Sequence, residues 1–181
     1  MKQRGLFRRT IDLPPLRWAR DLGLHRAYVR RQRFANWLFQ RVLGLNRDCP
    51  WSVHFTSRVV MPEKIVLGRG VERSLMFSRG CYLQGGNGIL IGHRTIFGPG
   101  VKIISANHAV TPPRRWVDDD PVVIGEECWI GANAVILPGV HLGDRVVVGA
   151  GAVVTRSFES GAVIAGNPAR VLRVLPEPPA R

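Results

Sequence analysis

An unbroken six-residue period runs through the second half of the chain. From Pro121 the sequence reads PVVIGEECWIGANAVILPGVHLGDRVVVGAGAVVT, with an aliphatic residue at every sixth position: Ile124, Ile130, Ile136, Leu142, Val148 and Val154. Small or apolar residues recur two positions before the last five of these: Cys128, Ala134, Val140, Val146 and Ala152. An α-helix turns every 3.6 residues or so, which would carry members of this series away from any one face. A short strand followed by a glycine-tolerant corner accommodates the period, and three such units close one coil of a parallel β-helix.

The same frame appears less regularly upstream. It is visible at Ile91-Gly92, Phe97-Gly98 and Ile103, with a trace at Leu67-Gly68. Between His108 and Pro121 turn formers and charges replace the period, so we interpret residues 109–121 as an extruded loop. Without this loop, residues 59–165 suffice for about five coils. The predicted fold class is all-β, a parallel β-helix with an N-terminal α-helical arm.

The net charge of +13 is concentrated near the N-terminus. Residues 1–41 hold eleven basic side chains against Asp12 and Asp21, a net charge of +9. Residues 20–45 lack proline, and apolar residues recur on one side between arginines: Tyr28, Ala35, Leu38, Val42 and Leu45. This pattern predicts a basic amphipathic helix that ends at Gly44.

Two functions of the arm remain open at this point. The helix packs its apolar stripe on the open first coil, or residues 1–45 contact an anionic membrane surface. The two are compatible if they use opposite faces of the helix, and the second draws on residue types suited to the headgroup boundary: Tyr28, Phe34, Trp37, Leu38 and Phe39.

We expect the chain to divide into three parts, and the sequence argues against a membrane-spanning, secreted or nucleic-acid-binding protein. These parts are a basic arm (1–48), the β-helix (49–172) and a proline-rich tail (173–181). The sequence contains no run of roughly 18 apolar residues, so no membrane span is predicted, and no secretory signal is recognisable. Three cysteines without a CxxC pair disfavour disulfides and a zinc ribbon, which fits a reducing cytoplasm. The arm contains no recognised nucleic-acid module, so no nucleic-acid partner is expected.

The segments WIGANAVILPGVHLGD, GAGAVVT and AGNPARV resemble the hexapeptide-repeat acyltransferases. The resemblance spans about residues 50–172 and is closest to the sugar and polysaccharide O-acetyltransferases. It implies a left-handed coil, acetyl-CoA as acyl donor, and a homotrimer with three sites at its subunit interfaces. With the cysteine content and the basic arm, we expect a cytoplasmic enzyme, located at the inner face of the membrane if the arm binds lipid.

The resemblance assigns the catalytic role to His108, in SANHAVTPP just before the extruded loop. A histidine suits this role, because an alcohol becomes a good nucleophile only when a base takes its proton. The alternative is an ordinary turn histidine. The neighbouring Asn107 either hydrogen-bonds the acceptor or favours a left-handed corner, and both remain open.

Six further residues match positions that bind coenzyme A in the family. Trp129 corresponds to a residue lining the tunnel for the thioester end, or else it packs between subunits. The residues matching pantetheine and adenine contacts are Ala132, Ala150 and Thr155, and those near the nucleotide phosphates are Arg156 and Arg170. The related γ-class carbonic anhydrases bind zinc through closely spaced histidines, which this sequence lacks, so no metal is expected.

The acceptor side departs from the family pattern. Several sugar acetyltransferases have an Asn or Asp pair some twenty to thirty residues before the histidine, whereas this chain reads SRGCYLQGGNG, without a carboxylate. Ser78, Gln84 and Asn87 are the candidates for acceptor hydrogen bonds, although Asn87 also suits a tight turn. The resemblance favours O-acetylation of a sugar in surface polysaccharide or lipid-linked glycan biosynthesis. The alternatives are antibiotic O-acetylation and a non-enzymatic scaffold or basic binding protein.

Overall fold

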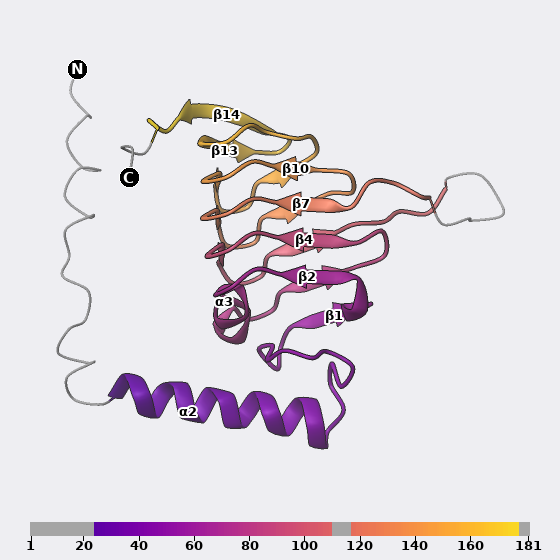
Figure 1. Cartoon of the computed structure of the whole chain (residues 1–181), viewed down its shortest axis with the longest axis vertical. Helices are drawn as coiled ribbons and strands as arrows, with labels where there is room; N and C mark the ends of the chain where they lie inside the picture. Colours follow the sequence, from indigo (N-terminus) through magenta and orange to yellow (C-terminus); the bar gives the residue numbers. More distant parts are fainter. Residues whose placement is uncertain (1–23, 110–116, 178–181) are drawn as a thin grey trace.

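The computed structural model describes residues 24–109 and 117–177, and these form a stack of triangular coils with a helix across one end (Figure 1). The first sheet contains β1 (Arg58–Val60), β3 (Tyr82–Gln84), β6 (Lys102–Ile104), β9 (Val135–Ile136) and β12 (Val153–Val154). The second contains β2 (Ile65–Leu67), β4 (Ile89–Ile91), β7 (Val122–Ile124) and β10 (His141–Leu142). The third contains β5 (Ile96–Phe97), β8 (Trp129–Ile130), β11 (Val147–Val148), β13 (Ala162–Gly166) and β14 (Ala169–Val174).

The chain visits the three sheets in turn, and each strand pairs in parallel with its counterpart one coil away. Gln84 of β3 lies opposite Ile104 of β6, for example, and Ile103 lies opposite Ile136 of β9. The five strands of the first sheet correspond to five coils, as the sequence predicts. Only the last pair, β13 with β14, is antiparallel among the described strands, and it closes the C-terminal end.

The six-residue period places its side chains in the core. All eleven residues of the two series predicted to face inward are buried, from Ile124 at 1% exposed to Val154 at 0%. The residues between them alternate outward, as a strand requires. The predicted interior of the second half of the chain is therefore confirmed position by position.

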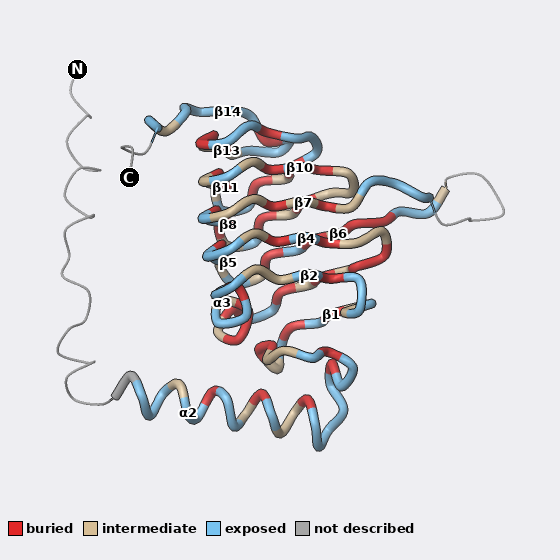
Figure 2. The backbone as a smooth tube through the Cα atoms, in the orientation of Figure 1, coloured by how far each residue is buried: buried red, intermediate tan, exposed pale blue. Residues whose placement is uncertain are grey.

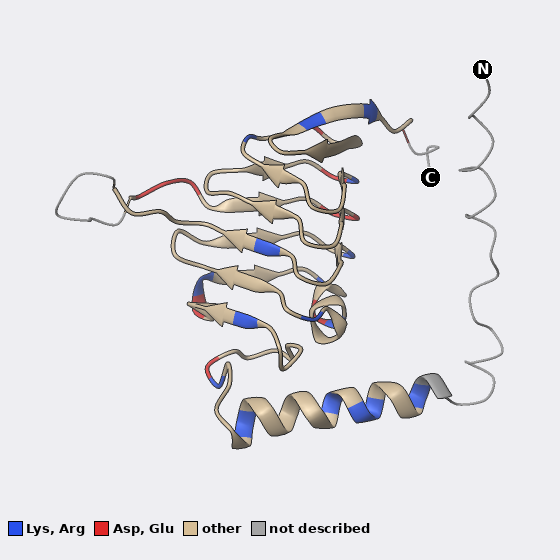
Figure 3. Cartoon of the chain, turned by 180° about the vertical axis from the view of Figure 1, so that it is seen from behind, with Lys and Arg blue, Asp and Glu red and all other residues tan. Residues whose placement is uncertain are grey.

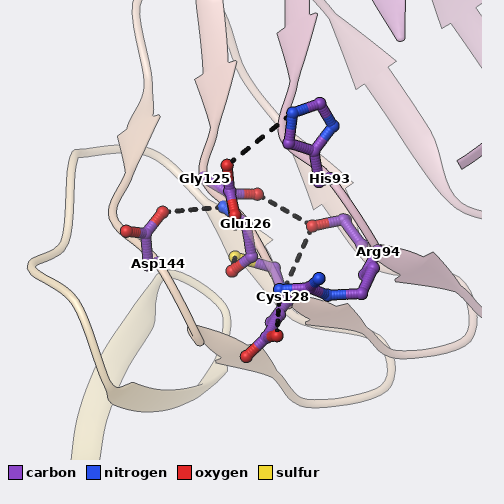
Figure 4. Close-up of polar contacts among 8 residues, drawn as sticks. His93, Arg94, Gly125, Glu126, Cys128 and Asp144 are labelled. Atoms are coloured by element: carbon purple, nitrogen blue, oxygen red, sulfur yellow. Dashed lines mark hydrogen bonds and ion pairs between the residues drawn. The ribbon is translucent and has the colours of Figure 1, made fainter. Parts of the chain in front are cut away.

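The corner between the second and third sheets, here called the charged corner, shows how the coils turn. Arg94, Glu127 and Arg145 occupy one column with φ near +57°, from 54° to 59°. The Glu127 amide donates to the carbonyl oxygen of His93 at 2.8 Å, and an ion pair joins Arg94 to Glu127. Figure 4 shows His93 and Arg94 of this corner beside Glu126 of the next coil. The backbone hydrogen bond recurs in the neighbouring coils, through the amides of Arg94 and Arg145, and the ion pair is exposed, so we assign this corner a structural role.

Helix α3 (Val71–Phe77) replaces a third-sheet strand in the first coil, which the six-residue frame does not predict. Two serines one helical turn apart supply the hydrogen bonds that a neighbouring strand would give. The amide of Phe97 in β5 donates to Ser74 Oγ, and Ser78 Oγ lies 2.8 Å from the Phe97 carbonyl oxygen. The backbone edge of β5 is thus satisfied by side chains of a helix.

Helix α2 (Leu24–Trp37), continued by the π-helical turn η1 (Leu38–Val42), lies across the open end of the first coil (Figure 1). Its buried residues are amides spaced by four: Gln32, Asn36 and Gln40. The Asn36 amide nitrogen donates to the Met76 carbonyl and its oxygen accepts from the Phe55 amide, both at 3.2 Å. Figure 2 shows these buried positions on the side of α2 that faces the coils.

The helix covers the first coil as expected, but only part of its apolar stripe packs there: Tyr28 stacks on Phe77 of α3, with ring centres 5.6 Å apart. Three members of that stripe are largely exposed: Tyr28 at 50%, Val42 at 57% and Leu45 at 42%. The open end of the first coil presents backbone groups, including the Trp51 carbonyl and the Val53 amide, which both bond Gln40. Backbone groups need polar partners, so amides and not aliphatic side chains make the cap. The part of the predicted arm before residue 24 lies outside the described residues.

No helix within the described ranges is long and apolar enough to cross a membrane.

We expect Asn36→Leu to lower the free energy of unfolding by about 1–3 kcal/mol, because several buried backbone and hydroxyl groups lose their partner. Urea unfolding followed by circular dichroism measures this change. Phe34→Leu on the outer side of the same helix, at a site 63% exposed, is the control, with an effect of about 0.5 kcal/mol or less. Equal stability of the Asn36→Leu protein would contradict the amide cap.

Candidate active site

The corner between the first and second sheets, here called the loop corner, holds the candidate base. Residues Asn107 and His108 follow β6 directly and are both exposed. Because β3 and β6 are in register, the ends of both strands meet at this corner. Gln84 and Asn87 therefore lie beside the segment that leads to His108.

Gln84 fixes the outgoing arm of the loop. Its side-chain oxygen accepts a hydrogen bond from the Ala106 amide at 3.1 Å, and its carbonyl oxygen accepts one from Ser105 Oγ at 2.7 Å. Ser105 is buried and its hydroxyl also accepts from the Asn87 amide at 3.0 Å. This network sets the backbone two residues before the candidate histidine.

Asn87 fixes the returning arm. Its side-chain nitrogen Nδ2 donates to the Val117 carbonyl oxygen at 2.9 Å, and the backbone amide of Val117 donates to the Asn107 carbonyl oxygen at 3.0 Å. Val117 is thus held between the two asparagines, and the loop is closed at its base. The side chains of Gln84 and Asn87, expected to contact the acceptor, have backbone partners within the loop corner.

The sequence analysis missed an acidic group at this corner. Asp118, Asp119 and Asp120 follow Val117 on the returning arm and are exposed, and Figure 3 shows them as the acidic stretch beside the extruded loop. The Asp119 carboxylate lies against the turn of the next coil, since a Cβ added at Gly139 would meet its oxygen at 3.0 Å. The run DDD just before the period resumes was the available signal, but we sought a carboxylate only upstream of the histidine.

Two of the predicted coenzyme residues lie at the same corner, two coils away. Thr155 and Arg156 follow β12, which is separated from β6 only by β9 in the first sheet. Both are exposed, and the guanidinium of Arg156 lies 5.0 Å from the ring centre of Phe158.

The other predicted coenzyme residues belong to the third sheet and its far corner, here called the alanine corner after Ala132 and Ala150. Trp129 begins β8, pairs with Ile96, and is 56% exposed. The carbonyl of Ala132 accepts from the Gly151 amide at 2.8 Å, so the two alanines stack in successive coils. Close stacking needs glycine nearby, because a Cβ on Gly98 would lie 2.6 Å from the Ala132 nitrogen.

Arg170 lies at the edge of the third sheet, whereas Ser78 lies apart from the other predicted residues. Arg170 is exposed in β14, with one guanidinium nitrogen 3.0 Å from the Ala169 carbonyl oxygen. Ser78 is buried and precedes β3, so it lies at the opposite end of the first sheet from His108. Its hydroxyl bonds carbonyl groups of the helix and of β5. Within one chain, the predicted site residues therefore fall into two separate groups. The loop-corner group contains Asn107, His108, Thr155 and Arg156, and the third-sheet group contains Trp129, Ala132, Ala150 and Arg170.

The cysteines are poor nucleophiles. Burial raises the pKa of Cys49 and of Cys128 to about 11 and also raises the pKa of Cys81. Their thiols therefore stay protonated near neutral pH. Burial, with a smaller contribution from Arg79, lowers the pKa of His54, which packs inside the first coil against Phe55. Within the described residues, no group of three metal-binding side chains comes together.

Known proteins resemble the chain in sequence and in fold. The family model described as the hexapeptide repeat of succinyl-transferase matches residues 121–156. A maltose O-acetyltransferase from Clostridium difficile 630 has a TM-score of 0.59 at 27% identity, covering 88% of this chain and 91% of that one. A hexapeptide-repeat acetyltransferase from Vibrio cholerae O1 biovar eltor, solved with acetyl coenzyme A, has a TM-score of 0.59 at 25% identity and covers 83% and 91%.

The chain shares its repeat and its fold with the hexapeptide-repeat acyltransferases. Its coil is accordingly the left-handed β-helix of this family. A protein of Escherichia coli K12 provisionally named as a lipopolysaccharide biosynthesis O-acetyl transferase, WbbJ, is 29% identical over 87% of each chain. Five other curated relatives match only in part, since the chain spans between 42% and 48% of their length.

We expect Gln84→Ala to accelerate hydrogen exchange of the Ala106 amide about five- to tenfold, because that amide loses its acceptor. Exchange followed by NMR measures this directly. Gln84→Glu keeps an oxygen at the same place and should retain most of the protection. Unchanged exchange in the alanine variant would mean that Gln84 does not fix the outgoing arm.

Proposed function

We propose that this protein is an acetyl-CoA-dependent O-acetyltransferase acting on a sugar hydroxyl. The observation that carries the proposal is the exposed His108 at the break of the coil, held by the closed base of the extruded loop. The resemblance in sequence to enzymes named maltose, galactoside and lipopolysaccharide O-acetyltransferases supports both the reaction and the class of acceptor.

In the proposed reaction, His108 acts as general base. Its imidazole takes the proton of the acceptor hydroxyl while the oxygen attacks the thioester carbonyl. The new carbon–oxygen bond forms and the carbon–sulfur bond breaks, so the acetyl group moves to the sugar. The imidazolium then returns its proton to the departing thiolate, which leaves free coenzyme A and a neutral histidine.

We assign the donor to the third-sheet group. The exposed Trp129 and the small Ala132 and Ala150 offer a flat wall along which a pantetheine chain can lie. Thr155, the other residue matched to a pantetheine or adenine contact, lies apart from this wall at the loop corner. Arg156 and Arg170 are exposed cations suited to the coenzyme phosphates, since a guanidinium binds phosphate through paired hydrogen bonds.

We further propose a homotrimer in which each site lies between two copies. The argument is the separation described above: the base lies at the loop corner and the donor wall on the third sheet. In a threefold ring, one face of each copy packs against a different face of the next, which brings the loop corner of one copy to the third sheet of its neighbour.

The acceptor group is proposed to face the loop corner. Exposed Asp118, Asp119 and Asp120 can accept hydrogen bonds from sugar hydroxyls, in addition to any contact by Asn107. We place the enzyme in the cytoplasm, with the catalytic β-helix over residues 49–172 and the arm over 1–48 directing it to the inner face of the membrane. An acceptor in surface polysaccharide or lipid-linked glycan synthesis fits this arrangement.

We expect His108→Ala to reduce turnover about 10²–10⁴-fold with coenzyme A affinity unchanged, the usual effect of losing a general base. Steady-state kinetics with maltose and galactosides, alongside calorimetric titration of coenzyme A, separate the two effects. Arg170→Ala is the opposite case: it should weaken coenzyme A binding, less so at high salt, while leaving turnover at saturation nearly intact. Normal turnover of the His108→Ala protein would move the base elsewhere.

A further inference from the structure

A basic cavity of about 690 Å³ lies between helices α2 and α3, away from the loop corner. Arg26, Arg30 and Arg33 line it from α2, and Arg73 lines it from α3. Glu72 is the one acidic residue on its described lining. Four guanidinium groups around one open cavity suit a ligand with phosphate oxygens, which each guanidinium can bind through two hydrogen bonds.

The outer side of α2 carries aromatic residues next to these arginines. Phe34 and Trp37 are 63% and 53% exposed, and their rings stack with centres 6.0 Å apart. They take no part in fixing the helix to the coils, because Asn36 and its neighbouring amides do that on the inner side. The described helix, Leu24–Trp37, contains no acidic residue.

Charge and apolar surface therefore coincide on one exposed face. Figure 3 marks the basic residues that recur along α2 at the end of the coil stack. A soluble phosphate compound would account for the arginines but not for an exposed aromatic pair. An anionic bilayer accounts for both, because its phosphates lie at the depth where aromatic side chains partition.

We propose that α2 and the arginine cavity form a docking site for the phosphate groups of anionic membrane lipids. Arg26, Arg30, Arg33 and Arg73 bind lipid phosphates in and around the cavity. Phe34 and Trp37 enter the headgroup boundary beside them. This inference deepens the proposed function by naming the surface that holds the enzyme near a lipid-linked acceptor, but the binding itself requires no catalysis.

The test uses the full chain without acetyl-CoA, in flotation with vesicles. Phosphatidylcholine vesicles are compared with vesicles that also contain phosphatidylglycerol. We expect binding to the anionic vesicles that weakens as salt rises. Arg30→Gln with Arg33→Gln should lower the partition coefficient on the order of 25-fold, about fivefold per arginine.

The matched control variants remove arginines or apolar side chains from surfaces outside α2 and the arginine cavity. Arg58→Gln with Arg173→Gln deletes two exposed arginines of the coil body and should reduce binding far less. Phe34→Ala with Trp37→Ala should also release the protein, whereas Leu172→Ala with Val174→Ala, at exposed positions of β14, should not. The His108→Ala protein should bind like the unaltered chain, so loss of docking and loss of catalysis can be told apart.

Several results would overturn the proposal. Equal loss with both arginine pairs would mean binding by net charge alone. A matching loss of affinity for inorganic phosphate or coenzyme A in the Arg30/Arg33 double variant, with vesicle binding intact, would assign the cavity to a soluble phosphate compound. A change in sedimentation mass on Phe34→Ala with Trp37→Ala, with vesicle binding intact, would make the aromatic pair a contact between copies.

Discussion

The stacked inward column of small and β-branched side chains is the feature on which the rest of the structure depends. Each sheet has one such column, and a single coil supplies Ile124, Ile130 and Ile136 to the three of them, each fully or almost fully buried. Their uniform size keeps neighbouring coils at strand spacing, so each strand finds its backbone partners in the coils above and below. A larger or charged residue in this column would interrupt both packing and hydrogen bonding.

Because the column holds the coils together, the corners are available for other purposes. The charged corner is used for turning, with Arg94 and Glu127 in left-handed conformation and joined by an ion pair. The loop corner is the one place in the described coils where a long insertion leaves the wall, and its base is closed by Gln84 and Asn87. The scaffold therefore presents His108 from a fixed backbone while the loop beyond can differ among relatives.

The sequence predicts what repeats and fails where tertiary contacts decide. Ile130 and its counterparts could be assigned to the core because one residue in six has the same environment in every coil. Helix α3 could not, because its role depends on Ser74 and Ser78 satisfying the edge of a strand some twenty residues later. Asn36 was missed for a related reason: hydrophobic patterning treats an amide as a solvent-facing residue, but here the surface to be covered consists of backbone groups. Likewise, the hydrogen bonds of Asn87 to the returning arm follow from the loop's path, which no local pattern encodes.

We propose that two copies complete one site, with the base from the loop corner of one chain and the donor wall from the third sheet of the next. Co-expression of two inactive variants tests it most directly: His108→Ala, which lacks the base, and Ala150→Trp, which obstructs the donor wall at an exposed position. In randomly mixed trimers, one interface in about four combines an intact loop corner with an intact donor wall. We therefore expect the mixture to recover about a quarter of the activity of the unaltered enzyme. Activity no greater than that of the two variants measured separately would contradict a site shared between chains.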